Sequence, residues 1–257
     1  MLPESPVSEA APLEDIVAEA KRIITAAHAR DVPARLIGGL AVRLQIPGDE
    51  TPLMTRVYKD IDLAAPRGKG KQVGQMLEQL GYAPDSAFNT TNGHSRLLFF
   101  DLPHARQLDV FVGSFAMCHE IPLSDRITVR PVGIPLAELL MTKLQVVELN
   151  EKDRIDIFTI LYHHGLGDDD GRVNVGQVAT MCAADWGLWR TTKLNVERVR
   201  DGLDTAPISA AQKAVIASRL DQLWERIESE PKSRKWKLRN RIGDKVRWYE
   251  EPEEVDQ

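Results

Sequence analysis

The pattern of apolar and polar positions divides the chain into a first part that mixes helices with strands and a second part that is helical. Over residues 13–30, apolar side chains recur at the spacing of one helix face. Short apolar runs bounded by glycine, proline or polar residues indicate strands. The predicted strands cover residues 35–37, 59–63, 95–100, 107–112 and 127–132. Helices are predicted over residues 40–44, 72–80, 136–149 and 152–164.

The pattern changes after Gly165. The run 167–171 consists of glycine and aspartate and is a candidate domain boundary. Beyond it no strand is predicted, and helices are expected over residues 173–185, 188–203 and 210–228. We therefore expect an α+β fold, with a mixed β-sheet flanked by helices and then an all-helical C-terminal domain. The expected divisions are a flexible tail over residues 1–12, a first domain over 13–165 and a second over 166–257.

Two aspartates alternate with apolar residues in the predicted strand 59–63. A strand places every second side chain on the same face, so Asp60 and Asp62 point the same way, with Cα atoms about 6.6 Å apart. Like charges at this spacing repel, which favours a shared cation, and hard oxygen ligands suit Mg²⁺. The alternative for these two residues is a solvated edge strand.

A third carboxylate and a glycine pair extend the candidate site. Asp109 lies in the predicted strand 107–112 with apolar neighbours. Three carboxylates on adjacent strands can hold two Mg²⁺ ions about 3.5–4 Å apart and align a nucleophile with a phosphate. Gly38-Gly39 lies where a strand turns into a helix, so its backbone amides can approach an anion closely. Most such glycine pairs mark only a tight turn.

Composition limits the partners and the compartment. A net charge of −5 with 28% charged residues is typical of a globular protein and argues against one that coats nucleic acid by bulk charge. The chain has two cysteines, Cys118 and Cys182, which favours a reducing cytoplasm. No apolar stretch approaches the ~20 residues that span a bilayer, and residues 1–11 lack the pattern of a signal peptide. We therefore expect a cytoplasmic protein with no membrane partner.

The order of the motifs resembles the nucleotidyltransferase fold of the DNA polymerase β superfamily. Gly38-Gly39 is followed by Asp60-x-Asp62 and then by Asp109. Within that superfamily the chain is most similar to the AbiEii-type nucleotidyltransferases, a toxin family of abortive-infection and toxin–antitoxin systems. The further matches are the basic lead-in at residues 56–63, Thr142-Lys143-Leu144 and Lys152-Asp153-Arg154-Ile155-Asp156. The resemblance covers about residues 33–163.

The resemblance implies metal-binding roles. Asp60 and Asp62 would hold Mg²⁺, and Asp109 would complete the site and help to activate the acceptor. The chain departs from the family at two points. Twenty residues separate Gly39 from Asp60, which is longer than the usual gap, and Leu40 stands where the family has a small hydroxyl residue.

The resemblance also implies a nucleotide-binding group. Lys143 would contact the triphosphate, together with Lys59 and the Gly38-Gly39 turn. Asp153 and Asp156 are three residues apart and share a helix face, so one of them would support Lys143 or act as a base. These acids, with Lys152, also fit a simple salt-bridge cluster.

Three other groups of polar residues are weaker candidates for a functional site. Residues 67–71 form a basic turn that lacks the phosphate-loop pattern. His163-His164 before an acidic run fits a polar helix end better than a metal site. The stretch 232–247 is rich in Lys and Arg, with Trp236 and Trp248 interleaved. It would either dock phosphates and stack bases or form a solvated face neutralised by the acidic end.

These expectations define a reaction and two alternatives. We expect Mg²⁺-dependent transfer of a nucleoside monophosphate from a triphosphate to an acceptor, with a tRNA or other RNA end favoured. The toxin family adds an antitoxin protein as an expected partner. The first alternative is a nucleotidyltransferase that modifies a small molecule such as an antibiotic. The second is a catalytically silent protein that binds nucleotide, RNA or a protein partner.

Overall fold

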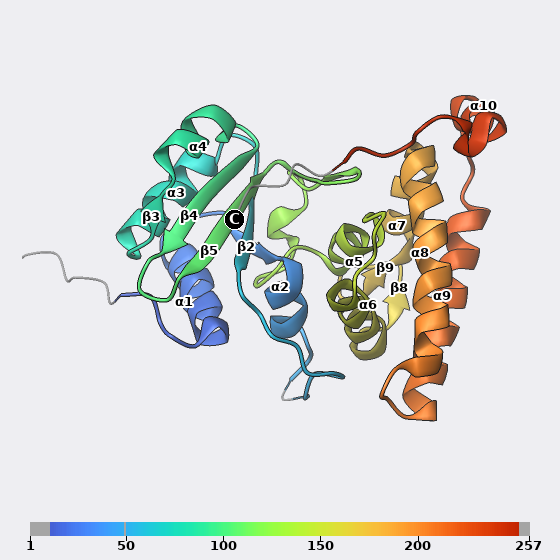
Figure 1. Ribbon diagram of the computed structural model, residues 1–257, viewed down its shortest axis with the longest axis horizontal. Helices are drawn as coiled ribbons and strands as arrows, with labels where there is room; N and C mark the ends of the chain where they lie inside the picture. The colour runs from blue at the N-terminus through green and yellow to red at the C-terminus, as the bar shows by residue number, and fades with distance from the viewer. Residues whose placement is uncertain (1–10, 49, 252–257) are drawn as a thin grey trace, which may run out of the picture.

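A five-stranded mixed β-sheet forms one side of the molecule and a group of helices forms the other (Figure 1). The computed structural model describes residues 11–48 and 50–251. The strand order is β1-β2-β5-β4-β3, in which β2 and β5 are parallel and the other pairs are antiparallel. The strands are β1 (Arg35–Ile37), β2 (Ile61–Ala65), β3 (Ala83–Pro84), β4 (Arg96–Asp101) and β5 (Arg106–Val112).

One face of the sheet is covered by α1 (Ile16–Ala29) and α3 (Gly70–Gln79). The side chain of Asp15 caps α1 by accepting a hydrogen bond from a first-turn backbone N–H, and the apolar stripe of the helix is buried. Gly74 lets α3 approach the ring of Phe99 on β4, because a Cβ there would already lie 3.3 Å from it. This packing accounts for the buried, apolar side of the strands.

The opposite face of the sheet carries the polar residues. The strand register sets Asp62 of β2 beside Asp109 of β5 and Asp109 beside Leu98 of β4, so these side chains share one face. Helix α2 (Gly38–Leu44) begins where β1 ends. Helix α4 (Ser86–Asn92) borders β4, where the Asn89 side chain exchanges hydrogen bonds with the backbone of Leu98.

The second half of the chain is mainly helical. A hairpin of β6 (Ser114–Ala116) and β7 (Glu120–Pro122) leads into it through the 3₁₀ turn η1 (Ile127–Val129). The remaining elements are α5 (Leu136–Leu144), α6 (Glu151–His163), β8 (Leu166–Gly167), β9 (Val173–Asn174), α7 (Val175–Ala184), α8 (Trp186–Thr205), α9 (Ala210–Ser229), α10 (Arg234–Ile242) and η2 (Gly243–Lys245). In the described residues, no helix is long and apolar enough to cross a bilayer.

The α+β prediction is confirmed at the level of a mixed sheet with C-terminal helices, but three local predictions are wrong. The strand expected over residues 127–132 is the short turn η1; Ile127 is buried there but Val129 is 46% exposed, so no apolar face exists to pair. The helix expected to reach residue 149 ends at Leu144. The short parallel pair β8–β9 follows residue 165, where no strand was predicted.

The placement of α5 and α6 bears on the domain division. Both helices pack against helices that follow them, α5 against α7 and α8, and α6 against α9. In Figure 1 they stand with the helical half rather than with the sheet. The division at residue 165 stays a prediction, and most of the predicted tail (residues 1–10) lies outside the described residues.

Candidate active site

Three carboxylates converge at the β2–β5 pair. Asp62 lies directly opposite Asp109 in the parallel register, and Asp60 immediately precedes the first residue of the strand, Ile61. Burial raises the pKa of Asp62 to about 7, with further increases from the charges of Asp60 and Asp109. The structure therefore brings together the three acids that the sequence singled out.

Asp109 has its own partners in this arrangement. Its Oδ1 accepts a hydrogen bond from Nε of Arg96 at 2.7 Å, and its Oδ2 accepts one from the amide of Gln107 at 2.7 Å. Within the described residues, no group of three or more His, Cys, Asp or Glu side chains is already arranged as a metal site. The donors nevertheless fit Mg²⁺, because all are carboxylate oxygens and the Asp62 carboxylate is crowded by like charge. Asp60 and Asp62 would hold the ion, and Asp109 would join them once Gln107 releases its Oδ2.

The glycine turn is packed against two charged side chains. Gly38 has a φ of +71°, a conformation that favours glycine, and the Asp62 carboxylate lies where a Cβ would stand. A Cβ on Gly39 would lie 2.5 Å from Nη1 of Arg56. The guanidinium of Arg56 therefore covers the turn that the sequence predicts as an anion-binding loop. It is held there by an ion pair with Asp156 and stacks 5.2 Å from the ring of Tyr58.

Lys143 sits between two acids of the next helix. Its Nζ lies 3.0 Å from Oδ1 of Asp153 and 3.0 Å from Oδ2 of Asp156, and its side chain is 11% exposed. Burial alone would lower the pKa of Lys143, but the charges of Asp156 and Asp153 outweigh it, so the pKa is raised and the ammonium stays charged. Since Asp156 also binds Arg56, it supports two cations, which suits a supporting role better than that of a base.

The ammonium of Lys143 interacts electrostatically with the carboxylates of the sheet. The charge of Lys143 lowers the pKa of Asp62, against the larger effects of burial and the neighbouring acids. A cavity of about 750 Å³ opens beside them and is lined in part by Lys59, Asp60, Gln107 and Lys152. Lys59 therefore lies at a cavity next to the carboxylates, as a nucleotide-binding role requires.

Three polar residues at this site had no role in the predictions made from the sequence: Arg56, Arg96 and Gln107. Arg56 stood in the basic lead-in without a function of its own. Arg96 and Gln107 had a usable signal, because the period of two places them on the same strand faces as Leu98 and Asp109.

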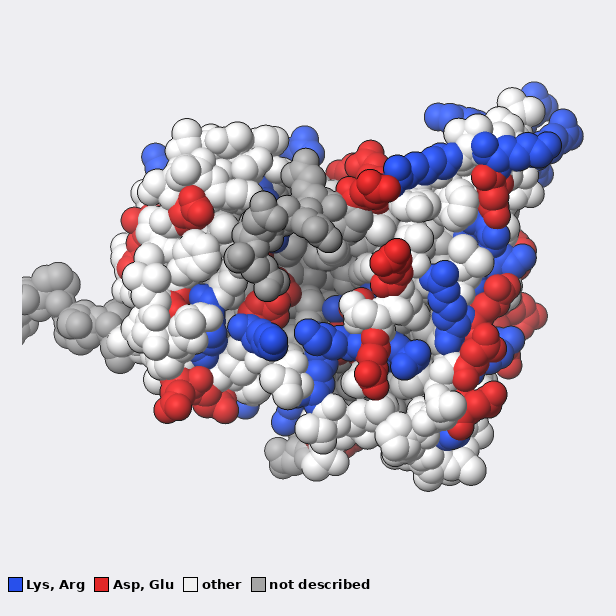
Figure 2. Space-filling model, viewed as in Figure 1, with Lys and Arg blue, Asp and Glu red and all other residues white. Residues whose placement is uncertain are grey.

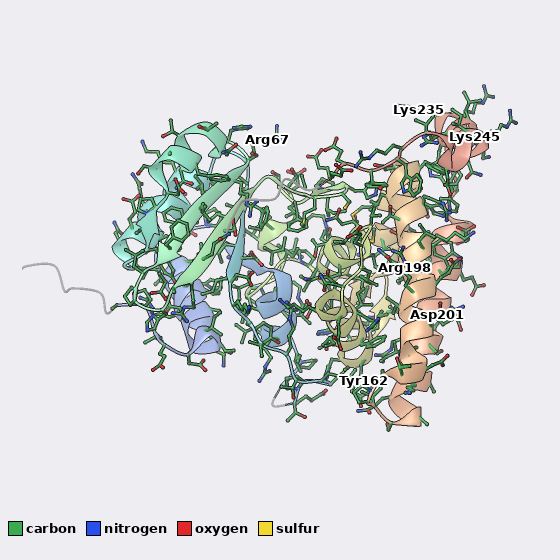
Figure 3. All side chains as sticks on the ribbon, in the orientation of Figure 1. Arg67, Tyr162, Arg198, Asp201, Lys235 and Lys245 are labelled. Carbon is green, nitrogen blue, oxygen red and sulfur yellow. The ribbon has the colours of Figure 1, made fainter. Side chains whose placement is uncertain are left out.

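The weaker candidates lie elsewhere. The basic turn 67–71 follows the opposite end of β2 from Asp60, and Arg67 is labelled at that end in Figure 3. His163 binds Glu50 through Nδ1 at 2.8 Å, while burial lowers the pKa of His164 to about 4. Asp169 pairs with Arg172 instead of with either histidine.

The C-terminal basic stretch divides into a packed side and a charged side. Trp236 is buried, with its ring 5.0 Å from that of Trp189, and Trp248 donates a hydrogen bond to Thr191. These rings belong to a tryptophan cluster, so they are not free to stack on bases. Figure 2 shows the Lys and Arg side chains of this stretch gathered on the projecting end that α10 forms in Figure 1.

Two comparisons of the chain with known proteins found no match. No protein-family model matches it, and no curated protein sequence matches it. The assignment of a function therefore depends on the geometry of the site itself.

Proposed function

We propose that the chain is a Mg²⁺-dependent nucleotidyltransferase with the fold of the DNA polymerase β superfamily, of the AbiEii type. The observation that carries the proposal is the in-register pair Asp62–Asp109, with Asp60 beside it, on one face of a mixed sheet. The Gly38-Gly39 turn and Lys143 adjoin the same carboxylates. Carboxylates, a glycine turn and a lysine are the groups that positioning and charge neutralisation at a triphosphate require.

In the proposed reaction, the residues of the chain have separate roles. Asp60 and Asp62 would hold Mg²⁺, which would supply charge neutralisation for the triphosphate when bound. Asp109 takes the proton from the acceptor hydroxyl, whose oxygen forms a bond to the α-phosphorus as the bond to pyrophosphate breaks. Lys143 and Arg56 provide positive charge for the β- and γ-phosphates, with Asp156 holding both side chains in place.

We favour an RNA end as the acceptor. Helix α10 lies far from strands β2 and β5, which carry Asp62 and Asp109, in Figure 1, so a long polyanion can contact both regions whereas a small molecule cannot. In the setting of a toxin–antitoxin pair, the protein would slow growth by modifying RNA until an antitoxin opposes it.

A catalytically silent nucleotide-binding protein is the second candidate. Two observations favour it: both oxygens of Asp109 accept hydrogen bonds, and Arg56 covers the glycine turn. It predicts nucleotide binding without turnover.

The test is incubation of the purified protein with Mg²⁺, each α-³²P-labelled triphosphate in turn, and total RNA. Label in RNA that disappears with EDTA and in Asp60→Asn and Asp62→Asn supports the proposal. Asp201→Asn is the matched control, because that residue is exposed on α8 and labelled far from the sheet in Figure 3. Label confined to a small-molecule fraction would assign a different acceptor, and no label in any fraction with any triphosphate would refute transferase activity.

A further inference from the structure

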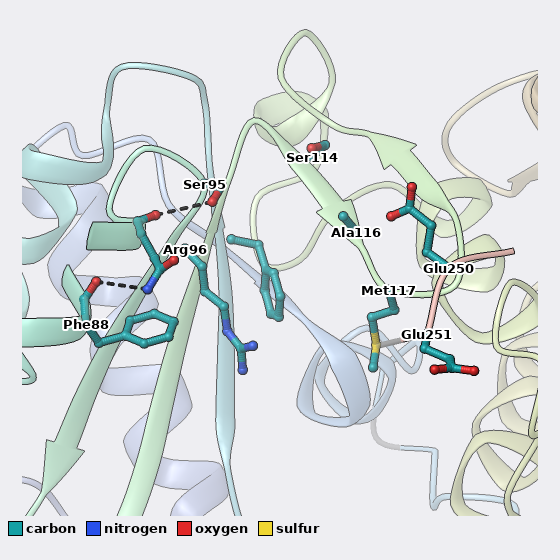
Figure 4. A pocket seen from close by; sticks show the side chains of 10 residues that line it. Phe88, Ser95, Arg96, Ser114, Ala116, Met117, Glu250 and Glu251 are labelled. Atoms are coloured by element: carbon teal, nitrogen blue, oxygen red, sulfur yellow. Dashed lines mark hydrogen bonds between the residues drawn. The ribbon is translucent and has the colours of Figure 1, made fainter. Parts of the chain in front are cut away.

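A second cavity lies beside β4 and is linked to the carboxylates through Arg96, which lines it and binds Asp109. It measures about 330 Å³, and we call it the Arg96 cavity. Figure 4 shows Phe88 and Arg96 on one side and Met117, Glu250 and Glu251 on the other. The lining joins the sheet, the β6–β7 hairpin and the C-terminal segment, so the cavity lies between the two halves of the chain.

The guanidinium of Arg96 is hydrogen-bonded along one edge and, within the described part of the chain, has unused donors on the other. Its Nε donates to Asp109, and its Cζ lies 5.3 Å from the ring centre of Phe111 and 5.9 Å from that of Phe88. Across the described residues, Nη1 and Nη2 of Arg96 donate no hydrogen bond, and the side chain is 27% exposed. A guanidinium fixed between two rings with a free pair of donors is preorganised for a phosphate or carboxylate.

The opposite wall carries two carboxylates in a fixed segment. The backbone N–H of Glu250 donates to the carbonyl of Cys118 at 3.1 Å, which ties this segment to the β6–β7 hairpin. Glu251 forms an ion pair with Arg247. A ligand that is anionic throughout would be repelled by this wall. One with a single anionic group and several neutral hydrogen-bond donors would satisfy both walls.

We propose that the Arg96 cavity binds the terminal nucleotide of the acceptor strand. The fork of Arg96 takes its phosphate, Phe88, which is partly exposed, contacts its base, and Glu250 and Glu251 accept hydrogen bonds from ribose hydroxyls or exocyclic amines. The volume is at the small end of the range of ligand pockets, which suits one nucleotide. Because Arg96 also holds Asp109, the bound end lies next to the group that takes its proton.

This inference rests on the proposed function, so its test has one arm that needs no turnover. A 5′-fluorescein-labelled single-stranded RNA of mixed sequence is titrated with the full-length protein in EDTA, and fluorescence anisotropy gives the Kd. We expect Arg96→Gln to raise the Kd by roughly tenfold or more. Arg200→Gln is the control, because Arg200 also pairs with an aspartate but lies on α8, and it should leave the Kd unchanged.

The second arm separates the two substrates. With the labelled triphosphate that supports transfer, Arg96→Gln should raise the KM for RNA and leave the KM for the triphosphate unchanged. Arg96→Lys, which keeps the charge but not the fork, should recover only part of the loss. Circular dichroism checks that each variant is folded.

The outcomes of the two arms are distinct. Equal Kd values for Arg96→Gln, Arg200→Gln and the unmodified protein, or a parallel rise of both KM values, overturns the acceptor site. Loss of RNA binding in Arg96→Gln from a protein that transfers no nucleotide supports the acceptor site while refuting the proposed function.

Discussion

The crowding of carboxylates around Asp62 should lower the free energy of unfolding at neutral pH by a measurable amount. Burial, with the charges of Asp60 and Asp109, raises the pKa of Asp62 from 3.8 to about 7. Between these values the folded chain holds a proton that the unfolded chain has released, so the free energy of unfolding falls as pH rises from about 4 to 7. At about 1.4 kcal/mol for each pKa unit, the full shift corresponds to about 4 kcal/mol. Since part of the side chain reaches solvent, we expect about 2 kcal/mol.

The perturbation that isolates this cost is Asp62→Asn, which keeps the shape and removes the charge. In EDTA at pH 8, urea unfolding followed by circular dichroism should give the variant a free energy of unfolding about 2 kcal/mol above that of the unmodified protein. At pH 5 the difference should shrink to less than about 1 kcal/mol, because folded Asp62 is then mostly protonated. Asp201→Asn, at an exposed position, should show the same small difference at both pH values.

Addition of Mg²⁺ gives a second measurement, in which a bound cation relieves the repulsion between the carboxylates. Saturating Mg²⁺ at pH 8 should stabilise the unmodified protein and leave Asp62→Asn nearly unchanged, because a ligand of the folded state stabilises it in proportion to its affinity. A gap between the two proteins that is the same at pH 5 and pH 8, or an Asn variant that is less stable at pH 8, would refute the reasoning about like charges.

Three further substitutions test the packing of the site and of the helical half. Lys143→Met leaves two acids of α6 without their shared ammonium, and we expect the free energy of unfolding to fall by about 3 kcal/mol in urea melts. Gly38→Ala should cost about 2 kcal/mol by the same assay, and more than Gly48→Ala. Both glycines have a positive φ, but a Cβ on Gly38 would meet the Asp62 carboxylate, whereas nothing in the described residues lies within 4 Å of a Cβ on Gly48. Trp236→Ala removes a buried ring of the tryptophan cluster and should lower the thermal midpoint, at a cost of about 3 kcal/mol.

The carboxylates of the site were within reach of sequence reasoning because a strand has a fixed period. Alternation placed Asp60 and Asp62 on one face, and apolar neighbours marked Asp109 as part of a buried strand. The lysine and acids of α5 and α6 were also grouped correctly, since Lys143 contacts Asp153 and Asp156. Local spacing carries this information without any knowledge of the tertiary contacts.

The partners of these residues were not within reach, because they depend on how distant segments pack. Arg56 forms an ion pair with Asp156, which lies a hundred residues later in the chain, and Arg96 forms one with Asp109 because their strands are paired. Trp236 was weighed as a base-stacking ring, yet the fold buries it against Trp189. The strand expected over residues 127–132 failed for the same reason, since nothing in the sequence revealed that Val129 faces solvent.

Helix α5 belongs to both halves of the molecule at once. It packs against α7 and α8, yet its Lys143 influences the charge of Asp62 on the sheet. A fragment that stops at residue 165 would therefore retain every proposed metal ligand but strip α5 and α6 of the scaffold that fixes their lysine and acids. Such a truncation would also expose the apolar surfaces that α7, α8 and α9 cover, and a cut before α5 would instead separate Asp156 from Arg56, so the sheet and the helices have to be kept together.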